Sequence, residues 1–214
     1  MSETAARRRA AILISGRGSN MVALLDAMAD PDYPAEAALV LSNDPAAPGL
    51  ALAAERGVAT ASVDHRPFRG DRAAFEAALG EALTEAEVDL VCLAGFMRIL
   101  TGDFVEAWRD RMVNIHPSLL PAFKGLDTHA RALAAGVAFH GCSVHLVRAE
   151  MDDGPILGQA SLTVRPGEDA DALAGRVLAL EHRLYPAALA AYLRGETRIE
   201  GEAIAPGPVA IAAE

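Results

Sequence analysis

The stretch "AAILISGRGSNMVALLDAMA", residues 10–29, carries the clearest indication of the fold class. Its apolar run ends at Ser15 in a glycine-rich turn, which is typical of a buried parallel strand. The residues that follow place Val22, Leu25 and Met28 on one helical stripe. A strand, a glycine-rich turn and an amphipathic helix in this order predict the start of a βαβ unit.

The rest of the chain first repeats this alternation and then departs from it. The expected elements are strands at 37–43, 58–63, 88–96 and 111–116, helices at 49–57 and 70–86, paired strands at 141–147 and 156–164, and a helical region at 169–195 that Pro186 interrupts. This pattern predicts an α/β fold, in which helices flank a mostly parallel sheet and an antiparallel C-terminal hairpin is added.

The composition argues against several classes of function. The formal net charge is -10, whereas nucleic-acid partners and charged membrane surfaces both attract proteins rich in Lys and Arg. No apolar run approaches the length of a membrane span, and the run at 10–15 is too short for a secretion signal. Cys92 and Cys142 lack the spacing of a disulfide scaffold or zinc site. We therefore expect free thiols in a cytoplasmic protein.

Besides His116, which is discussed below, the chain has five histidines: His65, His129, His140, His145 and His182. No pair among them has convincing metal-ligand spacing, so we expect no metal.

The motif "NIHP" at the end of the fifth expected strand carries two polar side chains. Asn114 and His116 are two residues apart, so they point to the same face of a strand, and Pro117 has no N–H to continue it. Ligands bind at the carboxyl ends of parallel strands. An Asn amide can donate to a developing oxyanion, and a His can transfer a proton near neutral pH. The plain alternative is a polar strand end with a hydrogen-bonded His.

The turn "MDDGP", residues 151–155, offers a carboxylate to that histidine. A His that must stay protonated, or keep one tautomer, needs a carboxylate beside it. Asp152 and Asp153 are both candidates, and spacing alone does not choose between them. The same residues also make a good turn without any catalytic role.

The loop "SGRGSN", residues 15–20, precedes the first helix and predicts an anion site. Backbone N–H groups at a helix N-terminus bind phosphate well, although Ser19 or Asn20 could simply cap the helix. A dinucleotide fingerprint starting at Gly16 would need glycine where Met21 stands, and a Walker A motif is absent. The loop therefore indicates a phosphate or another anion, without indicating NAD or ATP.

The segment "LAGFMRIL", residues 93–100, follows the fourth expected strand at the same edge of the sheet. A flat, mostly apolar ligand could lie there, although Met and Phe at such a place are more often part of the core. Arg98 among apolar residues is harder to explain as core.

Six motifs together resemble one family. They are "ISGRGSN", "LAGFMRIL", "NIHPSLLPAFKG", "GCSVHLV", "MDDGPIL" and "EHRLYP". Their order and spacing, from Ile12 to about Pro186, resemble the phosphoribosylglycinamide formyltransferase family of purine biosynthesis. "NIHPSLLP" with "MDxGP" is shared by folate-dependent formyltransferases in general, whereas "SGxGSN" with "AGFMRIL" is narrower.

The resemblance implies a Rossmann-like formyltransferase fold in a single domain over residues 1–214. Its expected parts are a phosphate-binding βαβ half at 10–115, a catalytic loop, hairpin and long helix at 116–195, and a tail at 196–214. The last residues of that tail, 206–214, are expected to be loose.

The resemblance also implies a reaction. The amine of glycinamide ribonucleotide would attack the formyl carbon of the co-substrate 10-formyltetrahydrofolate, and a tetrahedral intermediate would collapse to formylglycinamide ribonucleotide and tetrahydrofolate. Asn114 and protonated His116 would stabilise the oxyanion, and His116 would help move the proton to the leaving nitrogen. Asp152, the first carboxylate of the turn, would favour the protonated imidazole and relay protons. No metal is implied.

Binding residues are implied by position in the motifs. The resemblance places the ribonucleotide phosphate at Gly18, Ser19 and Asn20, the ribose at Glu181, and the folate at Arg72, Met97, Arg98, Ile99, Leu100 and Asn114. The expected partners are small molecules, without nucleic acid or membrane, and the chain is expected to be a monomer or a weak homodimer.

Three positions depart from the family pattern. Asp153 stands where a small residue, often Gly, is common, Leu178 where some members carry Gln toward the phosphate, and Asp127 where His is frequent. A carboxylate at 153 could perturb the pair of His116 and Asp152 or face solvent. These changes bear on affinity more than on the type of reaction.

Three alternatives remain for the function. A formyltetrahydrofolate hydrolase would use the same triad with water, and another formyltransferase would use a different amine, although the acidic, short chain argues against tRNA. A non-catalytic anion-binding module of the same fold would leave Asn114, His116 and the Asp turn unexplained.

Overall fold

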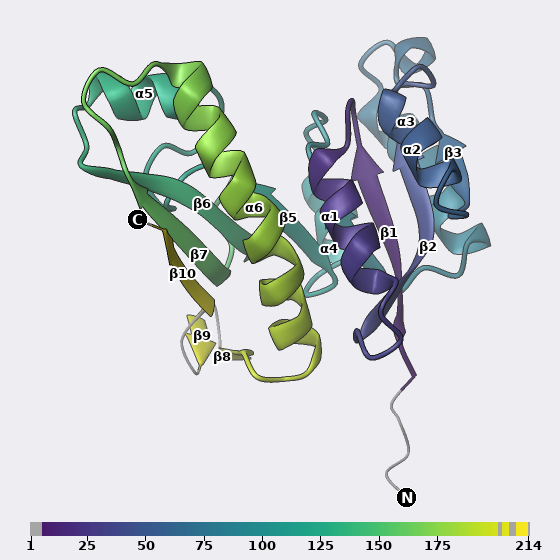
Figure 1. The fold of residues 1–214 in the computed structure, drawn as a ribbon. Coiled ribbons are helices and arrows are strands. Elements are labelled where there is room, and N and C mark those ends of the chain that lie inside the picture. The colour runs from purple at the N-terminus through teal and green to yellow at the C-terminus, as the bar shows by residue number, and fades with distance from the viewer. Residues whose placement is uncertain (1–5, 201–202, 206–208, 214) are drawn as a thin grey trace, which may run out of the picture. The chain divides into compact units, whose positions relative to one another are not determined.

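The computed structural model describes residues 6–200, 203–205 and 209–213, which form two compact units divided between Met112 and Val113. Each unit has its own layered arrangement of strands and helices (Figure 1).

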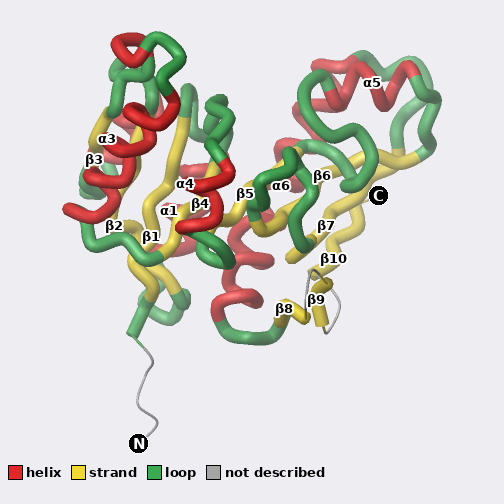
Figure 2. The backbone as a smooth tube through the Cα atoms, turned by 180° about the vertical axis from the view of Figure 1, so that it is seen from behind, coloured by secondary structure: helices red, strands yellow, loops and turns green. Residues whose placement is uncertain are grey.

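The first unit is a parallel α/β layer structure. Its elements are β1 (Arg8–Ile14), α1 (Ser19–Met28), β2 (Ala35–Ser42), α2 (Pro48–Ala54), β3 (Thr60–Ser62), a 3-10 helix η1 (Arg66–Phe68), α3 (Arg72–Glu85), β4 (Leu90–Leu93) and α4 (Gly102–Ala107). The strands run parallel in the order β4-β1-β2-β3. Helices α1 and α2 cover one face and α3 and α4 the other, as the two opposite views show (Figures 1 and 2). Right-handed crossovers produce this arrangement when the chain reverses direction across a sheet.

The second unit is mainly antiparallel. Its elements are β5 (Met112–His116), α5 (Thr128–Ala134), β6 (Phe139–Leu146), β7 (Ile156–Thr163), α6 (Ala170–Leu193), β8 (Arg198–Glu200), β9 (Ala203–Ala205) and β10 (Val209–Ala213). Strand β6 lies antiparallel between β5 and β7, and β10 adds to β7 in parallel. The predicted α/β architecture, with parallel strands followed by an antiparallel hairpin, is confirmed.

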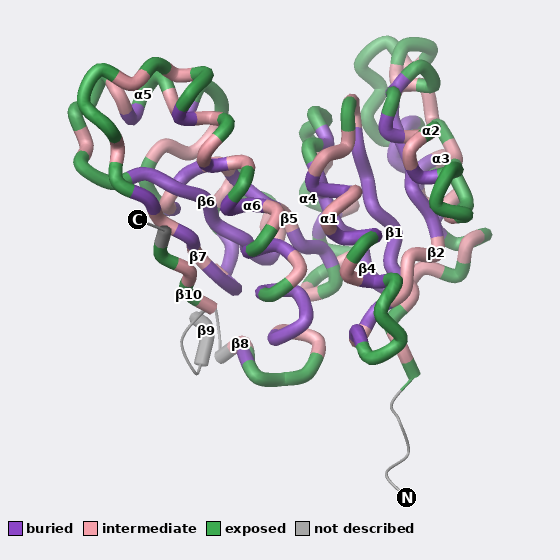
Figure 3. The backbone as a smooth tube through the Cα atoms, viewed as in Figure 1, coloured by how far each residue is buried: buried purple, intermediate pink, exposed green. Residues whose placement is uncertain are grey.

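Burial follows the apolar runs of the sequence. The run at residues 10–14 is completely buried, because helices cover both faces of the parallel strands. In the second unit, α6 packs its apolar stripe on the sheet, with Leu184, Tyr185, Ala188 and Leu189 completely buried. Figure 3 shows the buried backbone concentrated in these strands and on one side of α6.

Two expectations about the C-terminal part are wrong. Helix α6 continues through Pro186 without interruption. Proline removes one intrahelical N–H, but buried residues on both sides of it pack against β6 and β7 and hold the helical course. Residues 209–213 are also not loose, since they form β10, which pairs with backbone groups of β7 that would otherwise lie at a sheet edge. The rest of the expected loose stretch, 206–208 and 214, lies outside the described residues.

The short helices α4 and α5 were not foreseen. They have six and seven residues, which is too short for a hydrophobic periodicity to stand out. Within the described part of the chain, no helix has the length and apolar character that a membrane span requires.

Candidate active site

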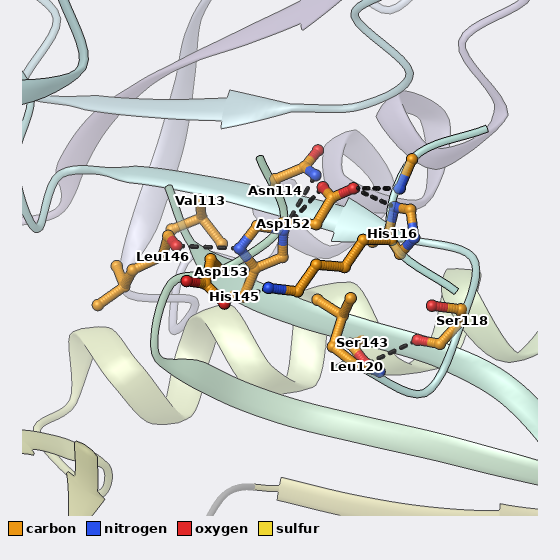
Figure 4. Close-up of polar contacts among 12 residues, drawn as sticks. Val113, Asn114, His116, Ser118, Leu120, Ser143, His145, Leu146, Asp152 and Asp153 are labelled. Carbon is orange, nitrogen blue, oxygen red and sulfur yellow. Dashed lines mark hydrogen bonds and ion pairs between the residues drawn. The ribbon is translucent and has the colours of Figure 1, made fainter. Parts of the chain in front are cut away.

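His116 ends β5 and lies between two hydrogen-bond acceptors, one of which is Asp152 (Figure 4). Its Nδ1 is 3.4 Å from Asp152 Oδ2, and its Nε2 donates to the backbone oxygen of Phe123 at 3.1 Å. The His116 ring is buried, and each of its two nitrogens faces an acceptor.

Asp152 is held in place from several sides. It lies in the β6–β7 loop, residues 147–155, with φ of 52°, a conformation that non-glycine residues seldom adopt. Its Oδ2 also accepts from the Gly125 N–H at 2.9 Å, and its Oδ1 lies 3.8 Å from His145 Nε2. The structure thus brings Asp152, rather than Asp153, to His116.

His145 contacts Asn114 and Asp152, and the sequence did not indicate it as a site residue. It lies on β6 opposite Asn114 in the antiparallel register. Its Nδ1 donates to the backbone oxygen of Leu146 at 2.9 Å, and its Nε2 accepts from Asn114 Nδ2 at 3.1 Å (Figure 4). Burial lowers the pKa of His145, so the ring is neutral and orients the Asn114 amide. The pairing of β5 with β6 is the signal that identifies it, and the sequence does not contain that register.

The β5–α5 loop, residues 117–127, is fixed by a serine of β6. Ser143 Oγ donates to the backbone oxygen of Ser118 at 2.7 Å and accepts from the Leu120 N–H at 3.0 Å (Figure 4). Gln159 Nε2 donates to the backbone oxygen of Leu120 at 3.0 Å. These bonds satisfy buried backbone groups and set the course of the loop that carries the Phe123 carbonyl.

A pair of histidines contacts this loop at Phe123. His129 Nδ1 is 3.2 Å from His140 Nε2, and the rings of His140 and Phe123 meet edge-on with centroids 6.0 Å apart. Burial, assisted by neighbouring histidines, lowers the pKa of His140 to about 4 and also lowers the pKa of His129. Both rings are therefore neutral near pH 7.

The glycine-rich loop of the first unit ends in the N-terminus of α1. Gly18, with φ of 73°, is the N-cap residue, so the alternative in which Ser19 or Asn20 caps the helix does not hold. Only a residue without Cβ adopts this conformation easily. No side chain caps the helix and no acidic residue stands in its first turn. The first N–H groups and the helix dipole are thus suited to an anion.

The loop is braced by the start of α2. The Gly49 N–H donates to the backbone oxygen of Gly16 at 3.1 Å. A Cβ at Gly49 would lie 2.4 Å from Ile14 Cδ1 and 2.9 Å from the same Gly16 oxygen, so the close approach of the two segments requires glycine.

The 94–100 segment lies beside this loop, since the Met97 N–H donates to Ser15 Oγ at 2.7 Å. Phe96 belongs to the core, being 9% exposed, but Met97 is 64% and Ile99 60% exposed. Exposed apolar side chains at the end of a strand are available to a ligand.

The two arginines expected near the folate are both exposed. Arg98 donates through Nε to the backbone oxygen of Met97 at 2.8 Å. Arg72 is the first residue of α3, directly after the N-cap Asp71.

The predicted site residues thus form two groups. Asn114, His116 and Asp152 come together in the second unit, where Glu181 is buried on α6. In the first unit, the hydrogen bond from the Met97 N–H joins the 97–100 segment to Ser15, where the glycine-rich loop begins, and Arg72 lies at the start of α3. The roles assigned to these residues stay predictions.

The three departures from the family pattern have distinct surroundings. Asp153 is 54% exposed and forms an ion pair with Lys124. Asp127 is the N-cap residue of α5 with φ of 56°, and Leu178 is half-buried on α6. Among the described residues no group of three or more potential ligands could hold a metal ion.

Comparison with known proteins gives the family. The formyl transferase family profile matches residues 8–189. The chain is 39% identical to phosphoribosylglycinamide formyltransferase of Escherichia coli over 90% of either protein. It is 44% identical to trifunctional purine biosynthetic protein adenosine-3 of Bos taurus over 90% of this chain, but it spans only 19% of that longer protein.

Among solved structures, the crystal structure of glycinamide ribonucleotide transformylase 1 from Symbiobacterium toebii matches with a TM-score of 0.88 and 43% identity, covering 92% of this chain and 93% of that one. The extent of the profile match and the identity to a relative of similar length show that this chain belongs to the formyl transferase family.

Proposed function

We propose that the chain transfers the formyl group of 10-formyltetrahydrofolate to the amine of N1-(5-phospho-D-ribosyl)glycinamide, a step of purine biosynthesis. The observation that carries the proposal is the cluster of Asn114, His116 and Asp152, in which a buried imidazole faces a carboxylate and an amide is oriented beside them. The relatives named for this reaction support the choice of substrates.

The reaction needs the cluster to stabilise an oxyanion and to transfer a proton. The lone pair of the substrate amine attacks the formyl carbon, and the carbonyl oxygen becomes an oxyanion. Asn114 Nδ2 has two hydrogens and uses one on His145, so the other can donate to the oxyanion. The His116 Nε2–H donates to the Phe123 carbonyl in this structure and can instead donate to the oxyanion, while Nδ1 stays beside Asp152.

Collapse of the intermediate completes the transfer. The bond between the formyl carbon and N10 of the folate breaks, and N10 takes a proton while the attacking nitrogen loses one. A protonated His116 can give its Nε2 proton to N10 and then take up the proton that the attacking nitrogen loses, so the ring returns to its starting state while Nδ1 stays beside Asp152. Holding both substrates in place supplies a further part of the rate.

The binding roles that the motifs imply are part of the proposal. The N–H groups at Gly18, Ser19 and Asn20 receive the phosphate, and Glu181 receives the ribose hydroxyls. The exposed side chains of the 97–100 segment contact the pterin, Arg98 and Arg72 contact the polar parts of the folate, and Asn114 contacts its formyl group. Support comes from the uncapped α1 N-terminus and the exposure of Met97 and Ile99.

The test follows the release of deformylated folate by absorbance, with glycinamide ribonucleotide and separately with water as the only acceptor. Turnover that depends on the ribonucleotide supports the transferase. Turnover without it would indicate a hydrolase instead, and absence of both would leave a binding role. His116→Ala should lose turnover yet keep ribonucleotide affinity, because the phosphate is bound by the 18–20 loop. A binding module would be indifferent to this substitution.

A further inference from the structure

Two loops each supply one of the acceptors that flank His116. The β5–α5 loop provides the Phe123 carbonyl, and the β6–β7 loop provides Asp152. The Phe123 carbonyl and Asp152 therefore stay on either side of His116 only if the two loops do not move relative to each other.

The loops are joined at the residues next to those acceptors. Lys124 Nζ and Asp153 Oδ1 form an ion pair, and the Gly125 N–H donates to Asp152 Oδ2 at 2.9 Å. Lys124 directly follows Phe123, and Asp153 directly follows Asp152. The ion pair is thus one residue away from each acceptor of the His116 ring.

The backbone at both acceptors needs such support. Phe123 and Asp152 have φ of 55° and 52°, in the left-handed region that costs a non-glycine residue free energy. A strained residue persists only where its surroundings hold it. Arg131 holds one side by donating to the backbone oxygen of Lys124, and the ion pair joins that same residue to the opposite loop.

We propose that Lys124 and Asp153 are positioning residues, whose ion pair clasps the two loops and so keeps the Phe123 carbonyl and Asp152 on either side of His116. The proposal rests on the proposed function for its effect on turnover. It also explains the second carboxylate of the "MDDGP" turn, since Asp153 faces Lys124 and its charge is neutralised there.

A charge-swap cycle tests the clasp. Lys124→Asp and Asp153→Lys each place like charges in contact, whereas the double variant restores an ion pair of reversed polarity. Because the side chains are 35% and 54% exposed, each single variant should lower kcat by about two- to five-fold, the range that exposed pairs support. The double variant should recover at least half of the loss, and KM for the ribonucleotide should not change.

A matched control separates the clasp from a general effect of charge. Glu106→Lys disrupts an exposed ion pair with Arg109 in the first unit, at 3.2 Å, and should leave kcat unchanged. Single variants with wild-type kcat, or a double variant no better than the worse single one, would overturn the proposal.

Hydrogen exchange of the Gly125 amide gives a readout that does not depend on the proposed reaction. This N–H is protected by Asp152 across the two loops, so its exchange should speed up in both single variants and slow again in the double variant. Unchanged exchange in all variants would refute the clasp. Failure of the wild type to formylate the ribonucleotide, with exchange responding as expected, would refute only the proposed function.

Discussion

His140 should make the free energy of unfolding fall as the pH is lowered from 7 to 5. The ring is 1% exposed, and its burial, with smaller effects of His129 and His116, lowers its pKa from 6.5 to about 4. Between these values the unfolded chain binds a proton that the folded chain rejects, so stability rises with pH. The stabilisation is complete above about pH 6.5 and is lost as the pH approaches about 4.

The size of the effect follows from the two pKa values. Integrating proton binding to the folded and unfolded states gives a loss of about 2 kcal/mol between pH 7 and pH 5 for this one group. His129 adds a loss in the same direction, since its pKa is also lowered by burial.

Urea unfolding at pH 7, 6 and 5 measures this loss, for the wild type and for His140→Asn. Asparagine cannot take up the proton, so the variant should be less stable at pH 7 but should lose about 2 kcal/mol less on going to pH 5. Val144→Ala, a buried substitution in the same strand, should lower stability equally at every pH. A pH dependence of His140→Asn as steep as that of the wild type would show that His140 does not cause the loss of stability.

Three further substitutions have defined outcomes. Gly49→Ala would place a Cβ 2.4 Å from Ile14 Cδ1, so urea unfolding should show that the free energy of unfolding falls by about 1–3 kcal/mol. KM for the ribonucleotide should also rise. An unchanged KM would show that the contact between Gly49 and the glycine-rich loop does not affect phosphate binding. Tyr185→Phe removes the buried hydrogen bond of 3.0 Å to the Val113 oxygen and should cost about 1–2 kcal/mol in the same assay; an equal stability would show that the oxygen finds another donor. Asp152→Asn should lower kcat by about 10²- to 10⁴-fold with ribonucleotide affinity retained, and near-normal turnover would exclude its proposed role.

The candidate site was partly predictable because its polar groups stand at strand ends. Asn114 and His116 share a face through the two-residue period of a strand, and Pro117 marks where β5 stops, so local geometry alone indicated a site. The apolar runs around residues 10–14 and 90–93 likewise predicted buried parallel strands, since complete burial leaves little room for polar residues.

Other features depended on contacts between segments far apart in the chain. Spacing does not choose between Asp152 and Asp153, and the fold turns the first to His116 and the second to Lys124. His145 joins the cluster through the register of β5 with β6, which depends on the packing of whole strands.

The longer strands and helices, and the polar residues at the strand ends, could be predicted from the sequence, because propensity, periodicity and turn chemistry act over a few neighbouring residues. Three features became visible only in the folded chain: α6 passes through Pro186, residues 209–213 pair with β7, and the backbone carbonyl of Phe123 accepts from the imidazole of His116. Each of these depends on burial and hydrogen bonding between distant segments, whose free energy overrides local preference.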